Sequence, residues 1–233
     1  MSGPRQIPMD LPLPASRSGA DFLTSPCNRA AWDAVQAWGD WPDRRLVLTG
    51  PEGAGKTHLA QVWSGLALAG MVTAAEVTEA RMAHLVEGPA VLVEDVDRVA
   101  ELPGPVQRQV ETVLFHLYNL AAERGLALLF TGRAAPAHWR IETPDLASRV
   151  LAMAHVRIAE PDDALLSSVL RKLFADRQMA VGEDVIEYLL RRIERSFVAA
   201  EQIAERLDRA ALAGQRRITR PLAADVLAEK DES

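Results

Sequence analysis

The stretch GPEGAGKTH, residues 50–58, decides which fold this chain is expected to have. It fits the spacing G-x-x-x-x-G-K-[ST], and it lies between an apolar run, RLVLT at 45–49, and a segment with helical spacing at about 56–69. Glycines in such a turn allow backbone N–H groups to point inward around a phosphate group, and the helix that follows directs the positive end of its dipole there. The stretch therefore predicts a phosphate-binding loop between a strand and a helix.

Two side chains of this loop have the chemistry that a bound nucleotide requires. Lys56 is expected to reach the β- and γ-phosphate oxygens of ADP or ATP, and the Thr57 hydroxyl is a hard oxygen ligand for Mg²⁺. A glycine-rich turn with only a structural role is the alternative. The predicted nucleotide-binding residues are Gly50, Pro51, Glu52, Gly53, Ala54, Gly55, Lys56, Thr57 and His58.

A second candidate site element is AVLVEDVD at 90–97, an apolar run that ends in acids. The carboxyl ends of parallel strands face the ligand in open α/β sheets, so these acids are expected beside the phosphate loop. We assign Glu94 to the metal and Asp95 to catalysis, as the group that orients and deprotonates the attacking water. A solvated strand end followed by a turn is the alternative interpretation.

Strand and helix signals alternate up to about Glu160 and only helix signals follow. Further strands are expected at 72–77, 90–95 and 126–132, with a long helix at about 105–124. This alternation implies crossover connections and a parallel sheet. The sequence predicts a flexible tail over 1–20, an α/β domain with a parallel sheet flanked by helices over 21–160, and a small α-helical domain over 161–233.

Composition narrows the functional class. The 233 residues carry a formal charge of −6, which argues against a surface built mainly to hold nucleic acid. Cys27 is the single cysteine and the five histidines show no ligand spacing, so neither a disulfide framework nor a cysteine-based metal site is expected. The sequence has no apolar run long enough for a membrane span and no signal-peptide pattern, and a cytoplasmic protein is expected.

The N-terminal stretch QIPMDLPLP, residues 6–14, reads as an extended peptide. Its three prolines exclude a helix, and Ile7, Met9 and Leu11 stand at alternate positions behind Gln6. A proline-stiffened peptide loses little entropy on binding and can fill a pocket with a few side chains. The pattern indicates a peptide that binds a partner.

A third motif, TPDLASRV at 143–150, looks like the start of a helix with an arginine near its end. In isolation Arg149 would be a surface cation. Its position between the last strand signal and the helical unit allows a second interpretation, an arginine offered to a nucleotide on a neighbouring molecule, where it would stabilise charge on the γ-phosphate.

The order of these motifs resembles a known family. The matching stretches are GPEGAGKTH, VLVEDVD, LLFTG, PDLASRV, and AERLDRAAL before QRRITRPLAADVL. Over about residues 21–229 the chain looks like the AAA+ module of the family of the bacterial replication initiator DnaA, and more closely like its short regulatory Hda branch. The resemblance implies an AAA+ P-loop domain followed by a helical lid. The chain stops at Ser233, so no dedicated DNA-binding domain is expected.

The resemblance also implies partners. Members of the Hda branch dock on the β sliding clamp of DNA polymerase III through an N-terminal peptide, for which Gln6, Ile7, Met9 and Leu11 are the matching residues here. Bound to ADP and to the clamp, they contact ATP-bound DnaA, and the arginine that matches Arg149 completes the DnaA ATPase site in trans. Self-assembly into a homo-oligomer is a further option.

Three departures from the DnaA pattern favour nucleotide binding with weak or no intrinsic ATPase activity. Glu94 stands where DnaA has an aspartate, and Arg133 stands where it has an acid. A second sensor arginine would fall at about Val198, where an apolar side chain cannot contact a phosphate, and the nearest arginine is Arg195.

Three functions follow as hypotheses. The first is a clamp-bound regulator that stimulates hydrolysis of DnaA-bound ATP. The second is an active ATPase of the helicase-loader or DNA-remodelling kind, for which short basic runs at 191–192 and 216–217 give thin support. The third is a nucleotide-gated adaptor that binds DnaA or another replication protein without stimulating hydrolysis.

Overall fold

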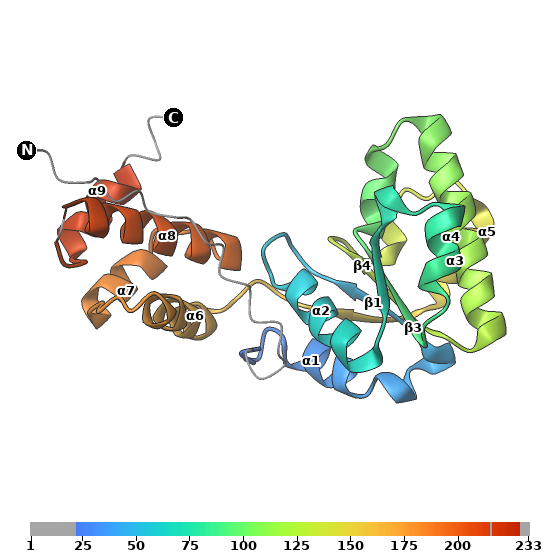
Figure 1. The fold of residues 1–233 in the computed structure, drawn as a ribbon, viewed down its shortest axis with the longest axis horizontal. Coiled ribbons are helices and arrows are strands. Elements are labelled where there is room, and N and C mark those ends of the chain that lie inside the picture. The colour runs from blue at the N-terminus through green and yellow to red at the C-terminus, as the bar shows by residue number, and fades with distance from the viewer. Residues whose placement is uncertain (1–21, 215, 229–233) are drawn as a thin grey trace, which may run out of the picture.

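The computed structural model describes residues 22–214 and 216–228. The clamp-binding residues expected from the sequence, Gln6, Ile7, Met9 and Leu11, lie outside the described residues. Within them the chain forms an α/β unit and a helical unit, joined by the segment that follows the last strand (Figure 1).

The α/β unit is built on a five-stranded sheet in the order β2-β3-β4-β1-β5. All four strand pairings are parallel, as the alternation of strands and helices predicts. Because parallel strands end at one edge, the segments after β1, β3 and β4 meet there. The strands are β1 (Arg45–Thr49), β2 (Gly70–Thr73), β3 (Ala90–Glu94), β4 (Ala127–Gly132) and β5 (Ala154–Arg157).

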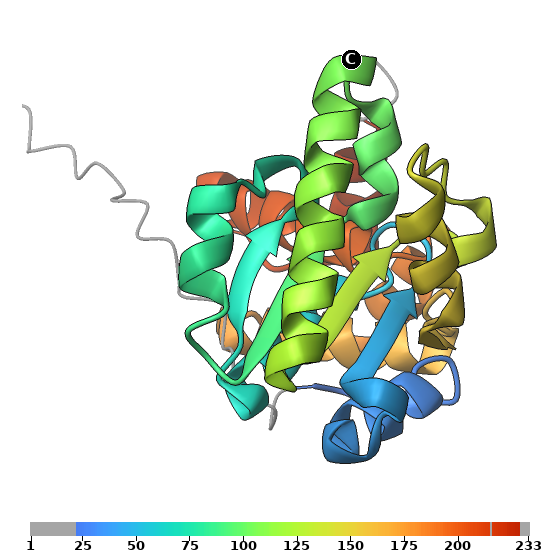
Figure 2. The same ribbon diagram turned by 90° about the vertical axis from the view of Figure 1, so that its right-hand side faces the viewer.

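Helices cover both faces of this sheet (Figures 1 and 2). One face packs against α1 (Arg29–Gln36) and α2 (Lys56–Ala67). The other packs against α3 (Glu79–Leu85), α4 (Gly104–Arg124) and α5 (Pro144–Ala152). The central strands β1, β3 and β4 are therefore buried along almost their whole length and apolar in their middle positions, because successive side chains point to opposite buried faces.

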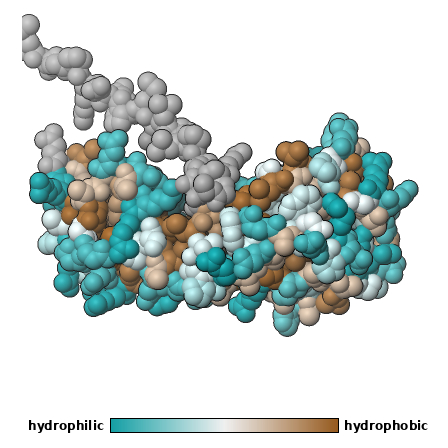
Figure 3. All heavy atoms as spheres, turned by 90° about the horizontal axis from the view of Figure 1, so that it is seen from below, coloured by the Kyte–Doolittle hydropathy of each residue, from teal (hydrophilic) through white to brown (hydrophobic). Residues whose placement is uncertain are grey.

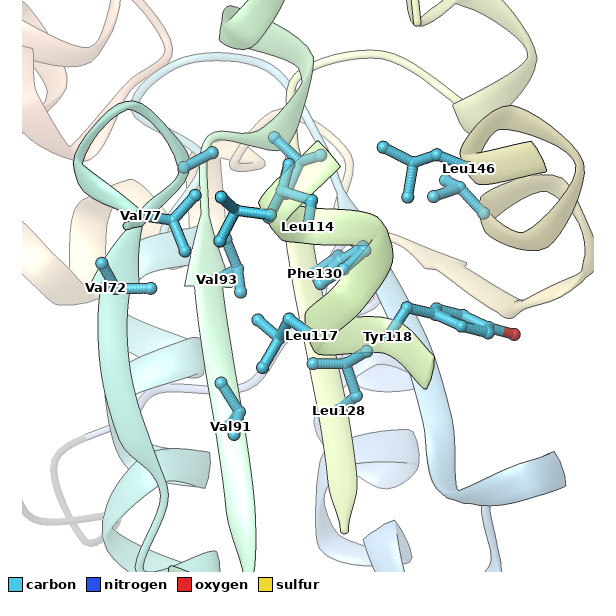
Figure 4. Packing of buried hydrophobic residues seen from close by; sticks show 14 of the residues in the cluster. Val72, Val77, Val91, Val93, Leu114, Leu117, Tyr118, Leu128, Phe130 and Leu146 are labelled. Carbon is cyan, nitrogen blue, oxygen red and sulfur yellow. The ribbon is translucent and has the colours of Figure 1, made fainter. Parts of the chain in front are cut away.

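The two faces divide each central strand residue by residue. In β4, Leu128 and Phe130 point into the cluster under α4, where Figure 4 shows them beside Leu114 and Leu117, whereas Leu129 joins the cluster under α2. All these side chains are fully buried, and burial of each stabilises the fold by about 1.5–3 kcal/mol.

Two edge features differ from the sequence prediction. The strand expected at 72–77 is Gly70–Thr73, and a 3₁₀ turn (Ala74–Glu76) takes its second half. The sequence analysis also missed β5, an edge strand whose side chains are only partly buried or exposed, so it lacks the apolar run that marks the central strands. The long helix α4 begins within one residue of its predicted start.

The helical unit consists of α6 (Asp163–Asp176), α7 (Glu183–Leu190), α8 (Phe197–Gly214) and α9 (Arg220–Ala228). Asp162 caps α6, its carboxylate accepting a hydrogen bond from the Leu165 N–H at 2.8 Å. One apolar cluster holds the unit together, with Phe174, Leu189 and Leu207 at its centre.

The surface is mixed in character. The face in Figure 3 shows hydrophilic side chains interspersed with smaller apolar groups. Among the described residues, no helix is both long and apolar enough to span a membrane.

Candidate nucleotide-binding site

The stretch 50–58 forms the turn from β1 into α2. Gly53 and Gly55 adopt φ values of +72° and +92°, a left-handed backbone that glycine tolerates without strain. Gly55 is the residue from which α2 starts, and Lys56 is its first helical residue. The N-terminus of a twelve-residue helix thus begins inside the loop, as a phosphate-binding loop requires.

Lys56 is buried in this turn, with 8% of its surface exposed. Its Nζ donates a hydrogen bond to the Pro51 carbonyl oxygen at 2.9 Å, so the side chain lies across the loop. Burial lowers the pKa of Lys56, and the nearby carboxylates of Asp95, Asp97 and Glu52 oppose that shift without cancelling it. A poorly solvated ammonium group gains from pairing with a phosphate oxygen.

The other predicted loop residues occupy distinct positions. Gly50 abuts Ile158, because a side chain there would come within 2.6 Å of the Ile158 carbonyl oxygen. Ala54 is buried and Glu52 is exposed. The His58 ring lies edge-on to Phe22, with centroids 5.4 Å apart.

Thr57 and Glu94 lie close together at this edge of the sheet. Burial raises the pKa of Glu94, and the Thr57 hydroxyl opposes the shift. The Oε1 atom of Glu94 is buried and has no hydrogen-bond partner. A hydroxyl beside a buried, unsatisfied carboxylate oxygen fits the hard oxygen ligands that Mg²⁺ takes with a nucleotide, so Thr57 and Glu94 could hold that ion.

Asp95 follows directly, with φ +57°, an unusual left-handed conformation for a residue other than glycine. Its N–H donates to the Thr131 hydroxyl on the neighbouring strand β4 at 3.0 Å. Strained backbone of this kind clusters at functional sites. The structure thus brings Asp95 to the same sheet edge as Lys56, a prediction made from parallel-strand geometry alone.

Arg133, just after β4, forms ion pairs with two acids of the 3₁₀ segment after β3 (Val96–Glu101). Its Nε lies 2.9 Å from Asp97 Oδ2, and its second contact is with Glu101 at 2.5 Å. The hydrogen bonds that Arg133 donates to both acids, above all to Glu101, raise its pKa. Asp97, the last acid of VLVEDVD, was not among the predicted site residues, although it was within the quoted motif.

The helical unit touches the phosphate loop directly, a contact that the sequence analysis missed. Phe197 is the first residue of α8, and its N–H donates to the Gly53 carbonyl oxygen at 2.9 Å. Its ring covers Gly55, where an added Cβ would lie 2.7 Å from a ring carbon. Ser196 abuts Gly53 and accepts a hydrogen bond from the Ala199 N–H at 3.0 Å, which caps α8.

Neither residue considered for a second sensor, Val198 or Arg195, covers the phosphate loop as Phe197 does. Val198 is 48% exposed, although it directly follows Phe197. Arg195 forms an ion pair with Asp163 at 3.0 Å. Its guanidinium is therefore held within the helical unit.

Arg149 lies elsewhere in the α/β unit. It is exposed on α5, and its guanidinium carbon lies 5.4 Å from the centroid of the Phe115 ring and 5.3 Å from that of Tyr118, both on α4. No acid among the described residues forms an ion pair with it. The helix α5 that carries Arg149 therefore packs on the sheet face opposite α2, the helix that Lys56 starts.

Comparison with known proteins identifies the two units. Residues 163–227 match the family model of the Hda lid domain. The helical unit therefore matches the Hda lid family, and the α/β unit has the AAA+ fold of the solved DnaA domain.

Solved structures share the whole arrangement. Domain III of the replication initiation protein DnaA from Thermotoga maritima superposes with a TM-score of 0.78 at 18% identity, over 94% of this chain and 98% of that one. AMPPCP-bound DnaA from Aquifex aeolicus superposes with a TM-score of 0.67 at 19% identity, over 85% of this chain and 67% of that one. The RuvB Holliday junction branch migration motor from Thermotoga maritima superposes with a TM-score of 0.68 at 15% identity, over 91% of this chain and 71% of that one.

Proposed function

We propose that this chain is an Hda-like regulator of replication initiation. It binds ADP or ATP at its own phosphate loop, docks on the β sliding clamp, and presents Arg149 to the nucleotide held by DnaA, whose hydrolysis it stimulates. The observation that carries the proposal is the position of Arg149, exposed on the sheet face opposite Lys56.

This position supports a role in trans. Arg149 has no acidic partner among the described residues, and its helix α5 covers the sheet face opposite α2, which starts in the chain's own phosphate loop. An arginine that acts on a phosphate from there must act on a second molecule. Supplying a guanidinium to the γ-phosphate in trans is an established way to accelerate hydrolysis by P-loop NTPases.

The chain's own site fits a bound nucleotide with little turnover. Lys56, Thr57 and Glu94 supply the phosphate and Mg²⁺ ligands, and the ion would neutralise charge on the phosphates. Asp95 would orient the attacking water. However, Arg133 is bound to Asp97, and Val198 has no charge to offer a γ-phosphate. DnaA from Aquifex aeolicus, a structural neighbour, was solved with AMPPCP bound.

The decisive experiment is hydrolysis of radiolabelled ATP held by DnaA, measured with this protein in the presence and absence of DNA-loaded clamp. Clamp-dependent acceleration is expected. Arg149→Ala should remove most of it, because trans-acting arginines contribute on the order of 10³-fold or more. Arg29→Ala, an exposed arginine on α1 across the sheet, is the matched control and should be as active as the unmodified protein.

No acceleration by the folded, nucleotide-bound protein would reject the regulator and favour an adaptor. Strong intrinsic turnover with binding to DNA or helicase would instead favour a loader or remodelling ATPase. The clamp contact is tested separately by measuring clamp binding of the triple variant Gln6→Ala, Met9→Ala and Leu11→Ala, in which Ile7 is left unchanged. Clamp binding that survives the triple change would reject the peptide's proposed role.

A further inference from the structure

The Tyr118 ring on α4 is held in place by a buried arginine from the sheet. Arg45, the first residue of β1, is 9% exposed, and its Nη1 donates to the Tyr118 hydroxyl at 2.8 Å. The guanidinium carbon of Arg45 also lies 3.9 Å from the ring centroid. Figure 4 shows the Tyr118 ring extending away from Leu114 and Leu117, toward one side of α4. With 5% of its surface exposed, Tyr118 has little freedom to move.

Arg149 lies over the same aromatic group. Its guanidinium carbon is 5.3 Å from the Tyr118 ring centroid, within the range of a cation–π interaction. Arg45 and Arg149 thus share one ring, and no acid among the described residues pairs with either. The cluster holds two positive charges without neutralising them.

We propose that Tyr118, fixed by Arg45, is the positioning residue for Arg149. This inference rests on the function proposed above. A free arginine side chain loses rotamer entropy when it is ordered against a phosphate, and a side chain that is already ordered loses less. An acidic partner would also order Arg149, but it would have to be displaced before the guanidinium could reach the phosphate. An aromatic ring orders the side chain and leaves its charge available.

A spectroscopic experiment tests the contact without any activity assay. The chain contains two tyrosines, so incorporation of 3-fluorotyrosine gives two ¹⁹F resonances, which Tyr188→Phe assigns. Arg149→Ala should shift the Tyr118 resonance and leave that of Tyr188 in place. Arg192→Ala is the matched control, because Arg192 lies 3.8 Å from the Tyr188 ring, and it should shift the Tyr188 resonance alone. An unmoved Tyr118 resonance in Arg149→Ala would overturn the proposal.

Hydrolysis of DnaA-bound ATP tests the consequence. Tyr118→Leu should lower the maximal stimulated rate about three- to tenfold, with the half-saturating concentration unchanged, and Tyr118→Phe, which keeps the ring, should retain most of the rate. In an Arg149→Ala background Tyr118→Leu should cause no further loss. Tyr188→Leu, which removes the other tyrosine flanked by arginines, is the control and should be neutral.

The failures of the two proposals are distinguishable. If Arg149→Ala leaves stimulation intact, the proposed function fails, and the ¹⁹F shift still decides whether Tyr118 orders Arg149. If Arg149→Ala abolishes stimulation but Tyr118→Leu does not reduce it, or reduces it equally without Arg149, the positioning role is overturned while the function stands.

Discussion

The N–H of Phe197 donates a hydrogen bond to the carbonyl oxygen of Gly53, so the first residue of lid helix α8 is bonded to the phosphate loop. Gly53 and Gly55 serve two purposes as a result. They allow the left-handed backbone of the loop, and they leave room for Ser196 and the Phe197 ring. A substitution in the loop is therefore expected to displace the start of α8, and a substitution at the start of α8 is expected to displace the loop.

The first prediction concerns Gly53→Ala. The new Cβ would lie 2.5 Å from the Ser196 Cβ, on a backbone at φ +72°. We expect the affinity for ADP, measured by calorimetry, to fall about tenfold or more, because left-handed backbone costs an alanine roughly 1–2 kcal/mol and the lid must also shift. Ser196→Gly should restore part of the affinity by relieving the clash.

Gly125→Ala is the control for that change. Gly125 follows the end of α4 at φ +66°, and no atom lies within 4 Å of an added Cβ. An alanine at this position would therefore strain the backbone without a steric clash. It should lower the melting temperature and leave ADP affinity unchanged. Equal ADP affinities for the two alanine variants would disprove the lid contact.

The second prediction concerns Val198→Arg. Val198 is exposed, next to the residue that covers the phosphate loop, and an arginine there would add a positive charge near the nucleotide. The ratio of ATP to ADP affinity should rise about fivefold or more, since a charge-assisted hydrogen bond contributes roughly 1 kcal/mol or more. Val198→Gln, which adds length without charge, should leave the ratio unchanged. An unaltered ratio in Val198→Arg would mean that this position faces away from the phosphates.

The third prediction concerns stability and pH at Glu111, a carboxylate on α4 that is 1% exposed. It accepts hydrogen bonds from the Gln107 side chain, the Glu142 N–H, and the N–H and hydroxyl of Thr143, which together fix the loop that enters α5. Burial alone would raise the pKa of Glu111, but these bonds outweigh burial and lower it below the ordinary 4.5.

Because the pKa is lower in the folded state, the stabilisation from Glu111 is complete above about pH 4.5 and is lost as the pH falls through the folded value. Glu111→Gln should lower the free energy of unfolding at pH 7 by about 1–3 kcal/mol and flatten its decline below pH 4.5. Urea denaturation across pH 3–7 measures both, and parallel curves for the two proteins would contradict the assignment.

The fourth prediction separates the two acids bound by Arg133. Asp97 has a side-chain exposure of 8% and Glu101 of 49%. Asp97→Ala should lower the free energy of unfolding by about 1–3 kcal/mol, because a mostly buried ion pair is broken. Glu101→Ala should lower the free energy of unfolding by less than about 1 kcal/mol, because exposed ion pairs contribute little. Equal costs in chemical denaturation would show that burial of Asp97 does not matter to the pair.

Much of the site follows from sequence because it is local. GPEGAGKTH specifies glycines, a lysine and a hydroxyl within one turn, and the strand-to-helix context comes from the adjoining apolar and periodic segments. Parallel-strand geometry then places Glu94 and Asp95 at the same edge. The predicted AAA+ fold with a helical lid is confirmed.

What only the tertiary structure decided depends on residues far apart in the chain. The contact of Phe197 with Gly53 joins two units, and the sequence pattern of α8 encodes its buried face but not what its first turn touches. Arg149 has the same local pattern whichever face of the sheet α5 covers. Its position beside Tyr118, across the sheet from Lys56, is fixed by the crossover connections and by side-chain packing, because a periodic pattern specifies that a face is buried and not which partner buries it.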